Sequence, residues 1–517
     1  MSDGRGRGIT VTEMAAMGQP IEVSPETTAA FVGRALRGPL NQPVLVCNFG
    51  EFRRRFGETW PRSSLGPAVR QFFEHGGRRL WVVRVANDAY GPKLALSASG
   101  SALLLRACEP GTTERIRAAV DYDGIDAGDA DSFNLTLQRV DPTTGHVIDQ
   151  EIFEKASCLE ESDTFVAELL ANSSLAGVER PYPTHRPEPT AGGHLPHDAV
   201  YVRHAEEGTD GLELTDYDLV GSHRDETGLF ALQQVDAFDL LYLPPPGKGR
   251  DLGLPSLLAA ELFCRQRGAM LIVDPDAGWS TPAEVVTGVR GRGLASPNLV
   301  AYFPRMRRRT GEDEAPRAVG AAVAGLLCRL DRGPGCWQDL DHPGMEFGHD
   351  LVAASDVEAD DVQALVREGV NVIVRGKGSK AHIAGSVTMA RGRESHGRFV
   401  SLSVRRLHLR IVNAIERGTR WAVFESDAEN AAEQVRGQVA ACLSSLADLG
   451  AFENDHFVVD CGRIPGLRPA EHEQGIAIRV GYHPQGSTCP IAFTLLQSVR
   501  GCRVTPTAFG RVNEKCT

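Results

Sequence analysis

The segment between residues 235 and 330 restricts the possible folds most strongly, because short apolar runs alternate there with helix-like stretches. The apolar runs lie at 239–243, 270–274 and 299–303, and the helix-like stretches lie at 257–267, 282–290 and 315–330. Short apolar strands alternating with helices are typical of a parallel sheet that is covered on both faces. The pattern therefore predicts a central α/β unit with a mainly parallel sheet.

Two amphipathic helices are predicted back to back between residues 399 and 461. The first has apolar residues at three- and four-residue steps and stops at Gly418; these residues are Val404, Leu407, Ile411 and Ile415. The second stops at Gly450 and carries the stripe Ala428, Ala432, Val435, Val439, Cys442, Leu446 and Leu449. The aromatic segment 420–425 between them is expected to be buried.

The length and the charge of the chain restrict which kinds of protein it can be. The chain has 517 residues, which is enough for roughly two to four domains. The net charge of -12 argues against nucleic acid as the main partner. No apolar run approaches the roughly 18 residues of a membrane span, and the first residues lack the apolar core of a secretory signal. We therefore expect a protein that is made in the cytoplasm and is not inserted into a membrane.

Several blocks resemble, in the same order, those of contractile tail sheath proteins. The first block has a strand, Gly-x-x-x-x-Gly-Pro, a phenylalanine helix ending at Gly57, a second helix, Gly76-Gly77 and a Val-Val-Arg-Val strand. Later blocks are Gly-Thr-Asp-Gly at 208–211, Thr-Gly-Leu-Phe-Ala-Leu at 227–232 and Gly-Thr-Arg-Trp-Ala-Val-Phe-Glu at 418–425. One departure is Thr488-Cys-Pro-Ile-Ala-Phe, where family members usually carry Pro-Ala-Glu-Phe.

The resemblance implies a multidomain fold of the α/β and α+β classes. It implies an N-terminal arm (1–28), a sheath core domain (29–86 with 345–500), and an inserted, variable, β-rich domain (87–207). An α/β domain (208–344), like subtilisin in topology but non-catalytic, and a C-terminal arm (501–517) complete the chain. In this scheme the N-terminal segment completes the C-terminal α+β core.

The resemblance also implies a structural function without an enzyme activity or a cofactor. The subunits would form a homo-oligomer, a helical sheath of stacked rings, around an inner tail tube protein in a metastable extended state. Contraction would then drive the tube through a target envelope. Baseplate and tail-terminator proteins would be further partners, with no nucleic acid and no membrane insertion. The particle would be a virion tail or a phage-tail-like particle assembled in the bacterial cytoplasm.

Extended segments near both termini are candidate inter-subunit arms, because main-chain hydrogen bonds can add a strand to a neighbour's sheet. The candidate arm residues are Ile9, Val11, Ile476, Ile478, Val480, Ile491, Phe493 and Leu495. The resemblance implies that the C-terminal core faces the tube, with candidate contacts at Arg406, Arg410, Glu429, Glu433 and Arg436. A solvated helix face is the alternative for each of these five.

The eleven cysteines are scattered and form no Cys-x-x-Cys pair, so zinc ribbons and thioredoxin-like motifs are unsupported. Cys489, Cys502 and Cys516 lie near the C-terminus and are candidates for inter-subunit disulfides after lysis. Three free thiols without a role are the alternative.

Enzyme alternatives rest on three features. Asp274 ends a predicted strand, where the aspartate of a hydrolase triad could lie, but no Gly-x-Ser-x-Gly motif accompanies it. The loop 247–250 lacks the residues that a phosphate loop requires. The possible metal ligands Asp341, His342, His349 and Asp350 lie in a Pro/Gly loop without a helical i, i+4 pair. A hydrolase on the central unit remains the main alternative, and a soluble metabolic enzyme is a third.

Overall fold

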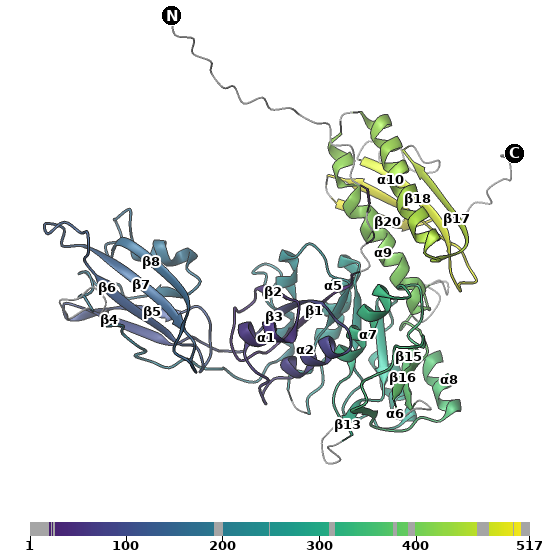
Figure 1. The fold of residues 1–517 in the computed structure, drawn as a ribbon, viewed down its shortest axis with the longest axis horizontal. Coiled ribbons are helices and arrows are strands. Elements are labelled where there is room, and N and C mark those ends of the chain that lie inside the picture. Colours follow the sequence, from purple (N-terminus) through teal and green to yellow (C-terminus); the bar gives the residue numbers. More distant parts are fainter. Residues whose placement is uncertain are drawn as a thin grey trace, which may run out of the picture.

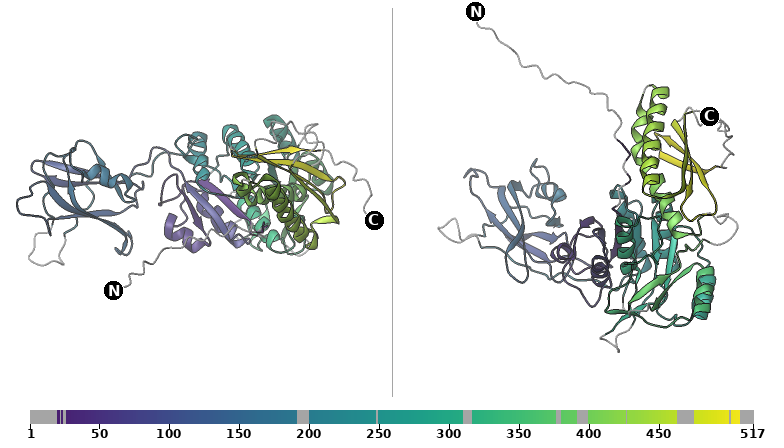
Figure 2. Two further views of the ribbon diagram at one scale, coloured as in Figure 1. Left: turned by 90° about the horizontal axis from the view of Figure 1, so that it is seen from above. Right: turned by 45° about the vertical axis from the view of Figure 1, so that its right-hand side comes forward.

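The computed structural model describes residues 20–21, 23, 26–190, 200–247, 249–309, 316–375, 380–390, 399–425, 427–462, 475–499 and 501–507. These residues form three lobes (Figure 1), with the inserted lobe on the left, the central lobe in the middle and the C-terminal lobe at the upper right. Figure 2 shows from two further directions that the inserted lobe stands apart from the other two. The predicted mixed fold, with one large, mainly parallel sheet and several antiparallel sheets, is confirmed in this form.

The central lobe is built on an eight-stranded sheet with the order β16-β15-β12-β11-β10-β1-β3-β2. The outer strands β2 and β16 run antiparallel to their neighbours, and the six strands between them are parallel. The eight strands are β1 (Thr28–Gly33), β2 (Pro43–Val46), β3 (Arg79–Arg84), β10 (Leu240–Tyr242), β11 (Met270–Val273), β12 (Leu299–Phe303), β15 (Val370–Arg375) and β16 (Ala381–Ala384).

Helices cover both faces of this sheet, as the alternation of strands and helices predicts. On β1, Ala29 and Phe31 belong to one hydrophobic core and Ala30 and Val32 to another. Successive side chains of a strand point to opposite faces, so a strand covered on both sides must be apolar throughout. The first core takes residues from α1 (Phe49–Phe56), α2 (Leu65–Glu74) and α7 (Gly320–Arg332). The second takes residues from α5 (Leu254–Arg267), α6 (Pro282–Arg292) and α8 (Ala359–Arg367).

The N-terminal strands belong to this central sheet, which corrects one prediction. We expected residues 29–86 to complete the C-terminal core, but β1 pairs in parallel with β10 and β3. The physical reason is that β1 is buried on both faces, which suits the middle of a doubly covered sheet. Three smaller elements of the lobe are α4 (Asp216–Val220), β13 (Met306–Arg308) and β14 (Leu351–Ala353).

The inserted lobe consists of two three-stranded antiparallel sheets that enclose one core. The first sheet contains β4 (Lys93–Ala98), β5 (Ser101–Ala107) and β9 (Ala176–Glu179). The second contains β6 (Ile116–Asp121), β7 (Ser132–Val140) and β8 (Val147–Ser157), and a short helix α3 (Val166–Leu169) lies against the same core. Residues 87–207 thus have the β-rich character that the resemblance implies for this segment.

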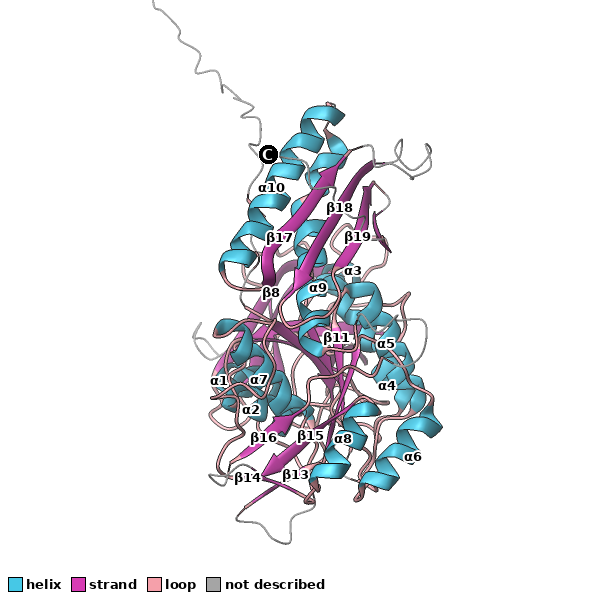
Figure 3. Ribbon diagram, turned by 90° about the vertical axis from the view of Figure 1, so that its right-hand side faces the viewer, coloured by secondary structure: helices cyan, strands magenta, loops and turns pink. Residues whose placement is uncertain are grey.

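The C-terminal lobe packs two long helices on an antiparallel sheet with the order β17-β18-β19-β20 (Figure 3). Its elements are α9 (Leu402–Gly418), α10 (Ala428–Asp448), β17 (Phe452–Cys461), β18 (Gly475–Pro484), β19 (Ile491–Ser498) and β20 (Gly501–Pro506). Ser401 and Asp427 begin the two helices by accepting hydrogen bonds from backbone amides of the first turn. None of the helices among the described residues is both long and apolar enough to cross a bilayer.

The predicted helix stripes are largely right, although Ala432 of the second stripe is only half-buried and Leu449 is exposed. Val404, Leu407, Ile411 and Ile415 of α9 are buried in the C-terminal core. Leu449, however, lies at the end of α10 and is 67% exposed, because the helix stops one residue earlier. Phe424 is 78% exposed, so the segment 420–425 is buried only in part.

Candidate functional site

A buried ion cluster joins the C-terminal lobe to the central lobe. Arg406 of α9 donates hydrogen bonds of 2.6 Å to both carboxylate oxygens of Asp331, which lies on α7. Arg410, one turn further along α9, reaches the same carboxylate at 2.8 Å. Thr27, just before β1, donates to Asp331 and accepts a 2.6 Å hydrogen bond from Arg410. The cluster therefore fastens three separate parts of the chain at one point.

This cluster corrects the prediction that Arg406 and Arg410 face a tube. The side chain of Arg406 is only 6% exposed and that of Arg410 12%, and both point inward to Asp331. A basic helix suggested a surface because the partner carboxylate lies 75 residues earlier in the sequence. The sequence signal for this buried ion pair is Asp331 itself, an acidic residue in a helix whose other residues are almost all apolar or small.

The other candidate tube contacts lie on the surface. Glu429, Glu433 and Arg436 are exposed along α10, and Arg436 donates to Glu433 at 3.4 Å. Exposed ion pairs at this spacing contribute at most about 1 kcal/mol to stability. Their charges are therefore available to a partner at little cost to the fold.

The predicted arm residues in β18 and β19 lie inside the subunit, which corrects their assignment as free arms. The six residues are buried in the core beneath α9 and α10: Ile476, Ile478, Val480, Ile491, Phe493 and Leu495. Their apolar character predicts burial, and it does not reveal whether the covering surface comes from the same chain. The other two arm candidates, Ile9 and Val11, lie outside the described residues.

The outer strands of the C-terminal sheet are open to pairing within the described part of the chain. β17 pairs with β18 alone, and β20 pairs with β19 alone. Most residues of β20 are exposed. Such an edge presents backbone groups that can bind a further strand.

Two of the three candidate disulfide cysteines are described, and they differ in environment. Cys489 is exposed, whereas Cys502 on β20 is half-buried. Burial raises the pKa of the Cys502 thiol to about 12. Cys516 lies outside the described residues. The structure thus leaves Cys489 as the accessible thiol of the pair.

Asp274 caps a helix, which explains its place at the end of β11. One carboxylate oxygen accepts hydrogen bonds from the backbone amides of Val319 and Gly320, at the start of α7, at 3.0 and 2.8 Å. The other accepts a 2.5 Å hydrogen bond from the hydroxyl of Tyr242. Burial raises the pKa of Asp274, and these hydrogen bonds lower it in part. None of these partners is a serine or a histidine.

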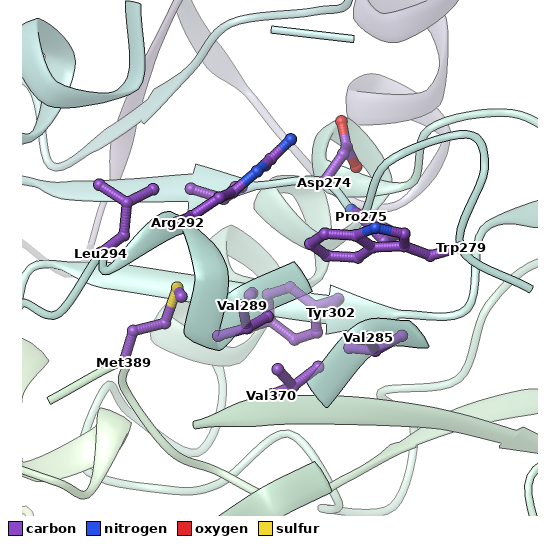
Figure 4. A pocket seen from close by; sticks show the side chains of 12 residues that line it. Asp274, Pro275, Trp279, Val285, Val289, Arg292, Leu294, Tyr302, Val370 and Met389 are labelled. Carbon is purple, nitrogen blue, oxygen red and sulfur yellow. The ribbon is translucent and has the colours of Figure 1, made fainter. Parts of the chain in front are cut away.

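The cavity beside Asp274 is too small for a substrate. Figure 4 shows it between Trp279, Val289, Tyr302 and other largely apolar side chains. Its volume is about 20 Å³, enough for about one water molecule, whereas ligand pockets usually measure roughly 300–1,000 Å³. The geometry does not support a hydrolase at this position.

The loop 247–250 is followed by a helix whose N-terminus, where a phosphate would bind, is already occupied. Gly247 and Arg250 form an isolated bridge, and Lys248 lies outside the described residues. The following helix α5 has its N-terminus occupied by the carboxylate of Asp216, which accepts from the amide of Gly253 at 3.0 Å and from Ser256 at 2.7 Å. A phosphate would have to displace this carboxylate.

The four candidate metal ligands are dispersed. Asp350 lies 3.8 Å from Arg308, and the ring of His342 contacts the carbonyl of Pro343 at 3.0 Å. Asp341 and His349 are exposed. Within the described residues, no three His, Cys, Asp or Glu side chains are grouped so that they could hold a metal ion.

Comparison with solved structures identifies the architecture. No model of a known protein family matches the sequence, and neither does any curated protein. A sheath tail protein from Listeria innocua matches with a TM-score of 0.60 at 13% identity, over 91% of this chain and 94% of that chain. The sheath of the extracellular contractile injection system PVC, in the contracted state, matches with a TM-score of 0.52 at 12% identity, over 97% and 96%.

A third match is the helical sheath of the anti-feeding prophage, also in the contracted state. It has a TM-score of 0.52 at 14% identity and covers 94% of this chain and 98% of that one. The matches span all three lobes, because each covers more than nine-tenths of both chains. The resemblance that the sequence blocks predict is therefore confirmed in three dimensions: this chain has the fold of contractile tail sheath proteins.

Proposed function

We propose that this chain is a structural subunit of a contractile sheath, which polymerises around an inner tube in an extended state and contracts to drive the tube through a target envelope. The observation that carries the proposal is the match of the whole chain, over all three lobes, to sheath proteins. Two of these were solved in the contracted state of a sheath, so the same architecture serves that motion in other proteins.

Polymerisation is supported by the open edges of the C-terminal sheet. A segment of a neighbouring copy can pair with β17 or β20 through main-chain hydrogen bonds, which hold regardless of sequence. A contact of this kind joins different surfaces of the two copies, so it extends into a helical filament when its rotation does not close into a ring. Ile21 and Thr27 contact their own subunit and β20 pairs with β19, so we assign only residues 1–19 and 508–517 to this exchange.

The arrangement of the lobes is compatible with two different packings of the subunits, one in an extended and one in a contracted sheath. The inserted lobe has a hydrophobic core of its own and can move as a rigid body against the other two lobes, which α9 and the Asp331 cluster hold together. The extended state would be held by a kinetic barrier, with the energy stored at assembly. Contraction of this kind needs no nucleotide.

We assign the exposed face of α10 to the inner tube, through Glu429, Glu433 and Arg436. Baseplate and tail-terminator proteins would bind the two ends of the sheath, since structures of the anti-feeding prophage baseplate also contain a matching chain. The particle would be a virion tail or a phage-tail-like device assembled in the bacterial cytoplasm. The hydrolase alternative gains no support, because Asp274 caps α7 and the adjoining cavity holds about 20 Å³.

Sedimentation velocity of the purified chain tests the proposal. A sheath subunit should form species far larger than a tetramer, and their amount should rise steeply with concentration. A chain that stays a monomer or small closed oligomer at every concentration would exclude it.

A further inference from the structure

A large groove separates the C-terminal lobe from the central lobe beside α9. Its volume is about 1050 Å³, which is enough for a peptide segment. One wall is formed by α9, β19 and β20, and the other by the end of α5 and residues 295–297. We call this cleft the α9 groove.

Arg405 lines this groove, and the hydrogen-bond donors of its guanidinium are only partly paired. Its guanidinium lies 4.6 Å from the ring centre of Phe399, and one nitrogen donates to the side-chain oxygen of Asn298 at 2.7 Å. The Nε atom is buried and has no hydrogen-bond acceptor. No carboxylate among the described residues forms an ion pair with it, in contrast to Arg406, the next residue along α9.

An arginine in this condition is unusual because burying a charge without a counter-ion is unfavourable. Burial lowers the pKa of Arg405 to about 10, so the side chain remains cationic at neutral pH. The free subunit therefore bears an energetic penalty that a carboxylate placed in the groove would remove.

The rest of the α9 groove is lined by three arginines and by two carboxylates, those of Asp236 and Glu416. Arg265 is exposed on its rim, and Arg267 donates to the carbonyls of Val235 and Asp236. Arg420 lines the groove too, but its charge is already paired with Glu416 at 2.7 Å. The chain as a whole carries 67 acidic and 55 basic residues, so a second copy offers more carboxylates than cations to this groove.

We propose that the α9 groove binds a carboxylate-bearing segment of a second copy of this chain, with Arg405 as the anchor. The inference rests on the proposed function, because it assumes that copies associate. It adds a charge-specific contact to strand exchange, whose main-chain hydrogen bonds do not distinguish one side chain from another.

The test compares Arg405→Met with Arg420→Met, which removes an arginine of the same groove that is already paired. Loss of one partner of a buried charge pair typically costs 2–5 kcal/mol, so Arg405→Met should weaken association by roughly 30-fold or more. Its melting temperature as a free subunit should stay at or above that of the unaltered chain, because an unpaired buried charge is gone. Arg420→Met should associate normally.

Direct binding provides a readout that does not depend on polymerisation. A hexaglutamate peptide should bind the unaltered chain and Arg420→Met, and should bind Arg405→Met at least several-fold more weakly at the same ionic strength. If Arg405→Met fails to fold, hydrogen exchange of residues 405–409 in the unaltered chain decides, because association should protect them.

Three results would overturn the inference. They are normal association of Arg405→Met, equal binding of hexaglutamate by both variants, and unchanged exchange of residues 405–409 on association. An unaltered chain that never associates would overturn the proposed function as well, so the two failures can be told apart.

Discussion

Asp331 on α7 and Arg406 on α9 meet inside the protein, with the guanidinium 2.6 Å from each carboxylate oxygen. The two residues come from different lobes, so this contact fixes how the C-terminal lobe sits on the central sheet. α9 strengthens the joint, because Leu402 and Leu409 pack in the central core while Leu407 packs in the C-terminal core.

Removing the charge of Asp331 should therefore strongly destabilise the subunit. Asp331→Asn leaves Arg406 buried without its carboxylate partner, and we expect a loss of about 3–5 kcal/mol in the free energy of unfolding. Denaturant titration measures this loss. Glu433→Gln is the matched control, since it breaks an exposed pair and should change stability by less than about 1 kcal/mol. An equal, small effect of both changes would contradict the role of the cluster.

Asp274 should matter for stability and not for chemistry. Asp274→Ala removes the acceptor for two amides at the start of α7, which should lower the free energy of unfolding by about 1–2 kcal/mol. Asp274→Asn, which keeps an acceptor oxygen, should be milder and should leave association unchanged. Assays with peptide and ester substrates should show no turnover to lose, and a hydrolytic activity abolished by Asp274→Asn would revive the hydrolase reading.

His408 should make the C-terminal lobe sensitive to acid. It lies between Phe399 and Phe493, 3.2 Å from the hydroxyl of Tyr482, and near the cation of Arg405 on the same helix. Burial, with a smaller effect of Arg405, depresses the pKa of His408 well below its usual value. The unfolded chain thus binds a proton first, so stability is present above the unfolded pKa of about 6.5 and is lost as pH falls below it.

The loss from this one group is at most about 1.4 kcal/mol per pH unit. Unfolding titrations between pH 7.5 and 5.5 should show it, and His408→Gln should flatten the profile in that range. His75, whose pKa burial also lowers, should contribute a second, separate part that His75→Gln removes. A profile unaffected by His408→Gln would show that this histidine titrates normally.

Removal of residues 1–19 should separate folding from polymerisation. Ile21, which is buried and packs closely over Gly418, stays in the shortened chain, so the C-terminal core remains complete. We expect an unchanged melting temperature together with the loss of large assemblies in sedimentation. Long assemblies from the shortened chain would exclude the N-terminal arm as an inter-subunit link.

The cysteines should differ in reactivity. Iodoacetamide reacts with thiolates, so exposed Cys489 should be labelled faster than Cys502, whose pKa is raised to about 12. If disulfides join neighbouring copies after lysis, non-reducing gels of assembled protein should show multimers that collapse with reductant. Cys489→Ser should shorten that ladder, and a monomer band under all conditions would exclude such bonds.

The sequence predicts which side chains are buried better than it predicts which part of the protein, or which other chain, covers them. The α9 stripe and the runs at 270–274 and 299–303 are placed correctly, because periodicity reports which side chains leave water. Ile478 and Phe493 are correctly apolar, but the same alternation serves an interface and the interior of one chain. The position of β1 in the central sheet depends on β10, over 200 residues away, and no local pattern encodes that pairing.

Charged residues show the same limit of prediction from sequence, because their type does not reveal what they contact. A helical arginine usually indicates a surface, and the sequence around Arg405, Arg406 and Arg410 does not distinguish them. In the structure one stands in a groove and two hold Asp331. These differences arise from packing between lobes, which only the three-dimensional arrangement reveals.

Electron microscopy of the purified, concentrated protein tests the central claim most directly. A sheath subunit should form hollow tubes of stacked rings, and subunits fitted into them should place α10 toward the lumen. Micrographs that show only single subunits or compact closed oligomers, under conditions where the chain is folded, would contradict the account.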